Sequence, residues 1–172
     1  MNEPELSLVP SEARRFQGTA AGIVTRLTAN TLDALVVAGA VLAAYVGFVA
    51  VRFVMAARDF HVPPTSLIWL TVGFFGLLDT YLAAAWWISG RTVGNHVMGI
   101  RVVTSAGGRL GLPRAVVRAL LCVGFPVGLL WCAVSPGRRS VQDLVLRTKV
   151  VYDWLPRPPR FTPETGPPRA DR

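Results

Sequence analysis

Charged residues are scarce in this sequence. Only 16% of its 172 residues are Asp, Glu, Lys or Arg, whereas 52% are hydrophobic, and the mean hydropathy is +0.44. An average soluble domain has about 25% charged residues, and here the apolar residues are concentrated in long runs. This composition excludes an ordinary soluble globular protein and indicates one membrane-embedded unit.

Recognisable catalytic and metal-binding motifs are also absent. The sequence has no glycine-rich phosphate loop, no HExxH helix and no nucleophile elbow, and its two histidines, His61 and His96, belong to separate segments. The two cysteines, Cys122 and Cys132, lie in one apolar run and read as core residues, not as disulfide partners or metal ligands. We therefore expect no enzymatic activity, no cofactor and no metal.

Acidic residues are outnumbered, so the chain carries a formal net charge of +8. The basic residues lie outside the apolar runs, as is typical of the cytoplasmic flanks of membrane proteins, which face anionic lipid. No zinc-ligand spacing or RNA-binding aromatic signature accompanies them. The charge predicts the lipid bilayer as a partner and argues against nucleic acid.

The first long apolar run extends from Arg26 to Val51, enough to cross the roughly 30 Å hydrocarbon core of a bilayer as a helix. Arg26, Asn30 and Asp33 are spaced i, i+4, i+7, which places them on one helix face. Inserting a carboxylate at the centre of a membrane costs about 2.5–3.5 kcal/mol of free energy on insertion scales. Asp33 is therefore expected to have a binding partner or a function. Two interpretations stay open: Arg26 reaches the lipid headgroups while Asp33 binds another helix, or this face forms an ion or proton site.

A second apolar run, Leu67 to Ile88, predicts another membrane-spanning helix. Tryptophans, which prefer membrane interfaces, lie near both of its ends, at Trp69 and at Trp86-Trp87. One face carries small residues that would allow close approach of another helix, namely Gly73, Gly76, Thr80 and Ala83.

Asp79 borders this small-residue face of the second run. If the two predicted helices are antiparallel neighbours, Asp33 and Asp79 lie at similar depths from the same membrane surface. Two ionised carboxylates at one depth repel, so either one holds a proton or a cation lies nearby. The alternative is that they face different helices and never meet.

The remainder of the chain has mixed character. Strand-like residues occur at Ile100 to Val103 and at Thr148 to Tyr152, and we expect these segments to pair on the cytoplasmic side. Between them Pro113 opens a helix that carries Arg114 and Arg118. Its apolar continuation from Ala119 to Val134 is short and is interrupted at Gly124-Phe125-Pro126.

Charge distribution favours a third run that enters the membrane and returns. In that arrangement 16 of the 18 basic residues lie on one side, and only Arg52 and Arg58 lie on the other. A full third span would divide the basic residues almost evenly, which the positive-inside rule disfavours. The plain third span stays as the rival interpretation.

These patterns predict an all-α membrane protein: two transmembrane helices plus a broken third apolar helical hairpin or span, with a short cytoplasmic β-pair. Residues 1–19 are expected to form a cytoplasmic N-terminal segment and 20–154 the membrane domain. The proline-rich residues 155–172 are expected to form a disordered tail.

Four segments carry a family resemblance: TRLTANTLDAL, with Arg26 and Asp33, then GRTVGNHVMGIRVV, GGRLGLPRAVVRALL and RRSVQDLVLRTKVV, with Asp143. In these segments the sequence resembles the RDD family of bacterial membrane proteins, named for one arginine and two aspartates. The resemblance implies a small multi-pass protein of the bacterial cell membrane. It also implies a suggested role in transport of unknown ligands, with a few relatives connected with cation/proton exchange.

Departures from the family pattern affect its charged residues. Thr92-Val93-Gly94-Asn95 replaces a Thr-Pro-Gly-Lys run, Gln142 replaces a histidine before the second aspartate, and Leu146-Arg147-Thr148 replaces Ala-Gly-Thr. The departures argue against any mechanism that uses that lysine or histidine as a charge or proton carrier. Asp79 is not one of the naming residues.

Asp143 is interpreted as an anchor that pins the C-terminal segment to the arginines of residues 89–118, in preference to a catalytic group. On a short helix it would also pair with Arg147 at i+4, with Arg139 four residues before it. Asp33 would be pinned in the same way by Arg118. Such buried pairs are sensitive to substitution, because a charge that loses its partner costs about 3–5 kcal/mol.

Two functional hypotheses follow. In the first, Asp33 and Asp79 help to move a small cation, a proton or a solute, which requires a homo-oligomer or a partner because two spans provide too few walls for a pathway. In the second, the protein is structural: its charges only lock the fold, and its small-residue faces bind another membrane protein. Both place the N-terminus in the cytoplasm.

Overall fold

The computed structural model describes residues 17–56, 60–62, 64, 66–135 and 137–154. The segment predicted for 1–19 lies outside these residues except for its last three, and the predicted tail lies wholly outside them. The described helices and strands are, in chain order, α2 (Ile23–Met55), α3 (Leu67–Ile88), α4 (Val93–Val97), β1 (Ile100–Thr104), α5 (Leu112–Gly124), η2 (Pro126–Leu129), α6 (Trp131–Val134), α7 (Val141–Leu146) and β2 (Thr148–Tyr152).

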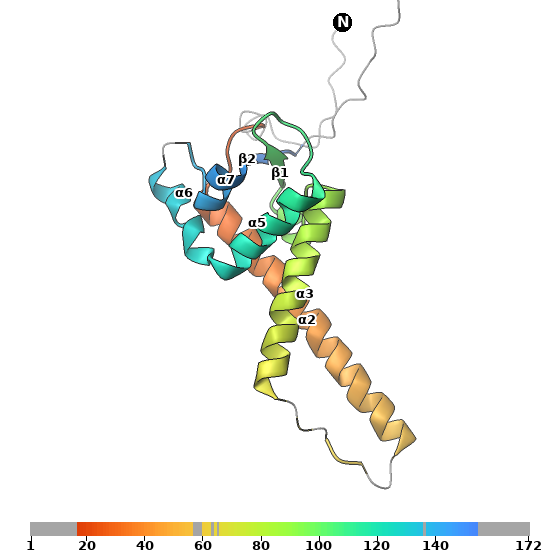
Figure 1. Ribbon diagram of the computed structural model, residues 1–172. Helices are drawn as coiled ribbons and strands as arrows, with labels where there is room; N and C mark the ends of the chain where they lie inside the picture. Colours follow the sequence, from red (N-terminus) through yellow and green to blue (C-terminus); the bar gives the residue numbers. More distant parts are fainter. Residues whose placement is uncertain (1–16, 57–59, 63, 65, 136, 155–172) are drawn as a thin grey trace, which may run out of the picture.

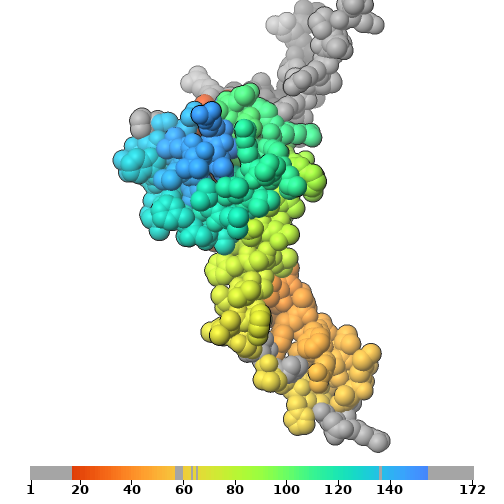
Figure 2. Space-filling view, in the orientation of Figure 1, coloured from red at the N-terminus to blue at the C-terminus, as the bar shows by residue number. Residues whose placement is uncertain are grey.

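Two long helices dominate the molecule (Figure 1). The 33 residues of α2 and the 22 residues of α3 extend about 50 Å and about 33 Å at 1.5 Å per residue. Both are long and apolar enough to cross a membrane, and α3 has the bounds predicted from the sequence. Their far ends diverge, whereas residues 89–154, which we call the head, gather around the start of α2 and the end of α3 (Figures 1 and 2).

The third apolar run is broken where the sequence indicated. Helix α5 ends at Gly124, and the following segment Pro126–Val134 is turned by 104° relative to it. Proline has no backbone N–H and disrupts the helix before it. The side-chain amide of Gln142 donates to the carbonyl of Phe125 at 2.8 Å and so satisfies an acceptor that the break exposes. The described chain thus has two candidate spans, or three if the bent pair is counted as one.

The predicted β-pair is present. Strands β1 and β2 are antiparallel, with Ile100 opposite Tyr152 and Thr104 opposite Thr148. The chain before α2 lies along the other edge of β2, where the amide of Gly18 donates to the carbonyl of Tyr152 at 2.8 Å. This small sheet therefore joins both ends of the described chain to the head.

The core lies between the end of α3, α5 and the sheet. Trp86 belongs to it with an exposed fraction of 3%, and the guanidinium of Arg118 lies 5.1 Å from its ring centroid. Trp86 faces α5, whereas the other two tryptophans of α3, Trp69 and Trp87, are exposed. Ala83 is also buried, so it does not belong to the exposed small-residue face of α3.

Candidate functional site

A buried carboxylate between two arginines joins three distant parts of the chain. Asp143 is 1% exposed, and Arg26 and Arg118 are each 3% exposed. Nη1 of Arg118 donates to Oδ1 of Asp143 at 2.6 Å, and Nη1 of Arg26 donates to the other carboxylate oxygen. We call Arg26, Asp143 and Arg118 the charge lock, because they connect α2, α5 and α7.

Local sequence positions Asp143 for this role. Ser140 caps α7, accepting from the amide of Asp143 at 3.2 Å, while the Asp143 carboxylate accepts from the amide of Ser140 at 3.3 Å. This reciprocal capping box fixes the carboxylate at the start of the helix, where the helix dipole favours negative charge. Thr148 adds a hydroxyl that accepts from Arg118 at 2.5 Å and lies 3.2 Å from the carboxylate.

The electrostatics keep Asp143 ionised. Burial by itself would raise the pKa of its carboxyl group, but the charges of Arg118 and then Arg26 outweigh burial and lower the pKa to about 2. The carboxylate is therefore negative at neutral pH and bound on both oxygens. Such a group is suited to holding segments together, as the sequence predicted.

Two details of the sequence-based interpretation are wrong. Arg26 does not reach lipid headgroups: besides Asp143, its guanidinium donates to the carbonyls of Ala21 at 3.1 Å and Arg138 at 2.9 Å. Arg147 does not pair with Asp143, because it ends α7 in a left-handed conformation with φ of 52°. Neither Arg147 nor Arg139 forms an ion pair with a described residue.

Asp33 is equally buried, at 1% exposure, but neutral donors hold it. Its carboxylate accepts from the hydroxyl of Thr92 at 2.5 Å, the amide of Gly94 at 2.7 Å and the hydroxyl of Tyr81 at 2.9 Å. The predicted pairing of Asp33 with Arg118 is wrong, because Arg118 is turned toward Asp143. Asp33 instead fixes α4 and α3 against α2 from within the same chain.

Gly94 permits the close contact between α4 and Asp33 on α2. A Cβ atom at position 94 would lie 2.8 Å from the carbonyl carbon of Ala29 and 3.0 Å from Cγ of Asp33, closer than atoms normally approach. The backbone of α4 therefore packs directly on α2. Thr92 and Gly94 are the two residues of the Thr92–Asn95 run that match the family pattern, and both bind Asp33.

The four most deeply buried charged residues balance in formal charge, whereas Asp153, at 8% exposure, pairs with other arginines. Arg26 and Arg118 supply two positive charges, and Asp33 and Asp143 supply two negative ones. Asn30, on the same face of α2 as predicted, lines an internal cavity of about 20 Å³ beside Arg26 and Arg118. Pairing of this kind reduces the cost of placing charge in an apolar interior.

Asp79 is separate from this network. It is half-buried, and its buried oxygen Oδ1 has no hydrogen-bond partner among the described residues. Residues two apart on a helix face about 200° away from each other, so Asp79 points away from Tyr81, which contacts Asp33. Within the described chain no hydrogen bond joins Asp33 and Asp79. This agrees with the interpretation that the two carboxylates face different helices.

Several residues of the site were not predicted from the sequence. Tyr81 and Thr148 look like ordinary members of a span and a strand, and only their positions opposite a buried carboxylate reveal their role. Gln142, next to Asp143, is 1% exposed, but adjacency alone does not predict this burial, because Leu144 on the other side of Asp143 is 47% exposed.

Chemically, the buried network is suited to holding structure. No group of three or more His, Cys, Asp or Glu side chains that could hold a metal ion occurs among residues 17–154 wherever they are described. Both cysteines are free thiols, with Cys132 buried and Cys122 half-buried.

Comparison with protein families identifies the chain. The model of the RDD family matches residues 20–147, which include Arg26, Asp33 and Asp143. The chain belongs to the RDD family. Comparisons with curated proteins and with solved structures found no match.

The contact between α4 and α2 generates a prediction. We expect Gly94→Ala to lower the free energy of unfolding by about 1–3 kcal/mol, because the added methyl group meets the Ala29 backbone and displaces α4 from Asp33. Thermal unfolding of the purified protein in detergent measures this change. Gly124→Ala is the matched control, since a Cβ there would meet nothing within 4 Å. Equal melting temperatures for the two variants would contradict direct packing of the α4 backbone on α2.

Proposed function

We propose that this protein is an assembly module of the membrane: its spans bind another transmembrane helix, while the charge lock holds the head in a fixed form. The supporting observation is a row of small residues on α2, Gly39, Ala43 and Gly47, spaced four apart. All three are exposed in the single chain. A Cβ added at either glycine would meet nothing within 4 Å.

The location of this row favours a partner outside the chain. Gly39 lies two residues from Val37, the last buried residue of α2, and so faces about 200° away from that buried side chain. Small residues four apart allow two helix backbones to approach closely in a membrane, where dispersion contacts drive association. Gly73, Gly76 and Thr80 form a second exposed face of this kind on α3. The occupant we infer is a second copy of the chain or another membrane protein.

The divergence of the two spans gives further support. Below their crossing, α2 and α3 leave an apolar groove of about 360 Å³, lined by residues that include Val41, Tyr45, Leu70 and Phe74. An added helix or lipid chains would fill this groove. In contrast, Asp33 already accepts three hydrogen bonds within the chain, which favours a structural role for it over an ion-carrying one.

The small-residue row gives a direct test of assembly. We expect Gly39→Leu and Gly47→Leu, combined, to raise the dissociation constant of the complex about tenfold, equivalent to about 1.4 kcal/mol, because the larger side chains separate the helices. Energy transfer between labelled copies in lipid vesicles measures self-association, and co-purification detects a different partner. Ala44→Leu, exposed on a neighbouring face, should leave association unchanged. A chain that stays monomeric and copurifies with no stoichiometric partner would contradict the proposal.

We propose further that the head and both termini are cytoplasmic. The supporting feature is that only two basic residues, Arg52 in the last turn of α2 and Arg58, occur between the middle of α2 and the start of α3, while the other 16 lie before α2, in its first turn or after α3. The positive-inside rule then places the head at the cytoplasmic surface. A reporter enzyme that works only in the cytoplasm, fused after Arg172, should therefore be active. An inactive fusion, together with activity of a second reporter that works only on the opposite side, would contradict this placement, because it requires the bent third run to cross the membrane or the whole protein to be inverted.

A second candidate function is transport of a small cation or proton by an oligomer. Asp79 favours it, because this carboxylate lies within a candidate span and has a buried oxygen that no group in the described part of the chain hydrogen-bonds. Intramembrane carboxylates of this kind often mark ion or proton pathways. Asp79 borders Gly76 and Thr80, so association through that face would bring it near another chain.

The transport candidate predicts a specific dependence on Asp79. We expect proton or monovalent-cation flux into vesicles containing the purified protein, reduced at least tenfold by Asp79→Asn and retained by Asp79→Glu, because only the latter keeps a titratable group. Circular dichroism verifies that both variants are folded. Indistinguishable flux from the wild type, Asp79→Asn and protein-free vesicles would eliminate transport and leave the assembly function.

A further inference from the structure

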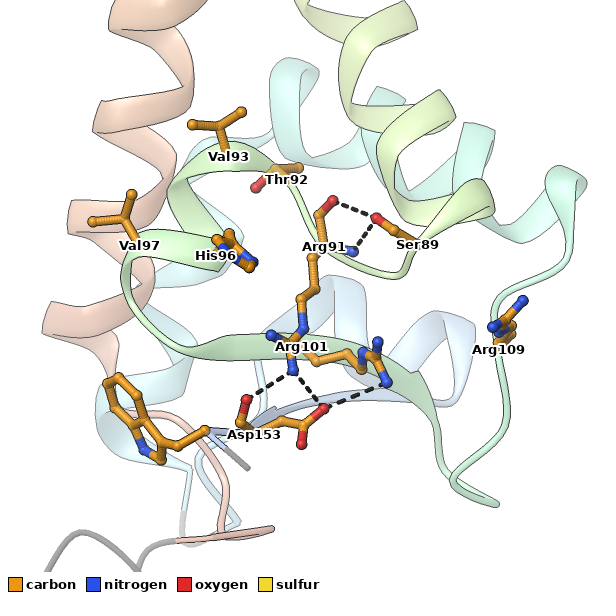
Figure 3. Close-up of a pocket in the computed structure, with 10 residues that line it drawn as sticks. Ser89, Arg91, Thr92, Val93, His96, Val97, Arg101, Arg109 and Asp153 are labelled. Carbon is orange, nitrogen blue, oxygen red and sulfur yellow. Dashed lines mark hydrogen bonds and ion pairs between the residues drawn. The ribbon is translucent and has the colours of Figure 1, made fainter. Parts of the chain in front are cut away.

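A large basic pocket lies on the head where α3 ends (Figure 3). Its volume is about 800 Å³, and its lining comes from Ser89 to Val97, from β1, from the loop after β1 and from the residues after β2. Three arginines line it: Arg91, Arg101 and Arg109. Neither the assembly function nor the transport candidate uses this pocket.

Two of the arginines are held in place by one carboxylate. Asp153 is 8% exposed, and its Oδ2 lies 2.6 Å from Nη2 of Arg91 and 3.4 Å from Nη1 of Arg101. Arg91 also donates to the backbone carbonyl of Asp153 at 2.7 Å. Figure 3 shows the two guanidinium groups converging on Asp153. Their positions are thus fixed before any ligand arrives, which lowers the entropic cost of binding.

The carboxylate does not neutralise the pocket. Among the described residues that line the pocket, Asp153 is the only acidic one, against three arginines. Arg109 stands apart on the loop that follows β1 (Figure 3). It is exposed and has no ion-pair partner within the described ranges. Guanidinium groups bind phosphate oxygens in a planar, paired geometry, which indicates an anionic group bearing phosphate oxygens as the ligand.

The apolar part of the lining indicates a lipid as the source of that phosphate. Val93 and Val97 line the pocket and are 49% and 59% exposed, and Trp154, at 42%, lies at its edge. The pocket begins at Ser89, one residue after the end of α3, where Trp87 and Ile88 are also exposed. A charged pocket with an apolar rim at the end of a span has the features expected of a phospholipid site. The headgroup would enter the pocket, and the acyl chains would lie along the span.

We propose that this pocket binds the phosphate headgroup of an anionic phospholipid, with Arg91 and Arg101 as the preformed part of the site and Arg109 as the side chain that closes on the bound phosphate. Val93 and Val97 contact the start of the acyl chains. The site fixes the height and rotation of the head at the membrane surface. It stands independently of the assembly interface on α2.

The test uses the full-length protein in detergent, with short-chain phosphatidylglycerol, short-chain phosphatidylcholine and inorganic phosphate as separate probes. Native mass spectrometry counts bound molecules as each probe is titrated. We expect phosphatidylglycerol to bind at least tenfold more tightly than phosphatidylcholine. Arg109→Gln should weaken phosphatidylglycerol binding about fivefold without affecting the fold, because the exposed side chain forms no ion pair with a described residue. Arg114→Gln, which removes the same charge from an exposed site on α5 outside the pocket, should leave binding unchanged.

Other outcomes overturn the proposal. Equal binding of the two lipids would show that the pocket does not recognise the anionic headgroup. Equal weakening by Arg109→Gln and Arg114→Gln would show that only the overall charge of the head matters. Inorganic phosphate that binds as tightly as phosphatidylglycerol would assign the pocket to a free anion. Arg101→Gln is the second variant: binding equal to that of the wild type would exclude the preformed part of the site, provided that the variant keeps its melting temperature.

Discussion

A charge inside an apolar protein must be paired or hydrogen-bonded, and this structure depends on how Asp143 meets that requirement. Its two carboxylate oxygens bind guanidinium groups from α2 and α5, and the adjacent Thr148 extends the contact to β2. Removing one member of a buried pair leaves the other charge unsatisfied, which costs about 3–5 kcal/mol. The head therefore has one well-defined arrangement in which all of these segments meet.

The second buried carboxylate, Asp33, positions α4 and through it the arginine-lined pocket. Asp33 holds α4 through Thr92 and Gly94, and α4 separates Arg91 from Arg101 along the chain. The position of α4 thus determines how these two arginines converge on Asp153 at the pocket. The naming residues of the family act mainly on the inside of the head, whereas the surfaces available for partners are the small-residue rows of the spans and the arginine-lined pocket.

The sequence predicted elements well where a periodic pattern or a breaker was present. The bounds of α3, the pairing of the two strands and the break at Gly124-Phe125-Pro126 followed from apolar runs, strand-like residues and proline. Partners of buried charges could not be predicted in the same way. The chain has many arginines, and the sequence led us to predict that Arg147 pairs with Asp143 and that Arg118 pairs with Asp33. Helix α7 ends before Arg147, however, and α5 directs Arg118 toward Asp143. The burial of Trp86 could not be predicted for a related reason: a position near a helix end does not indicate which neighbouring element covers the side chain.

The most direct test of the charge lock is a double-mutant cycle on Arg118 and Asp143. The free energy of unfolding in detergent would be measured for Arg118→Gln, for Asp143→Asn and for the double variant. If the two side chains stabilise the head through each other, the double variant should lose at least about 1 kcal/mol less than the sum of the single losses. Losses that simply add would show that the two residues act independently and would contradict the charge lock as the interaction that holds the head together.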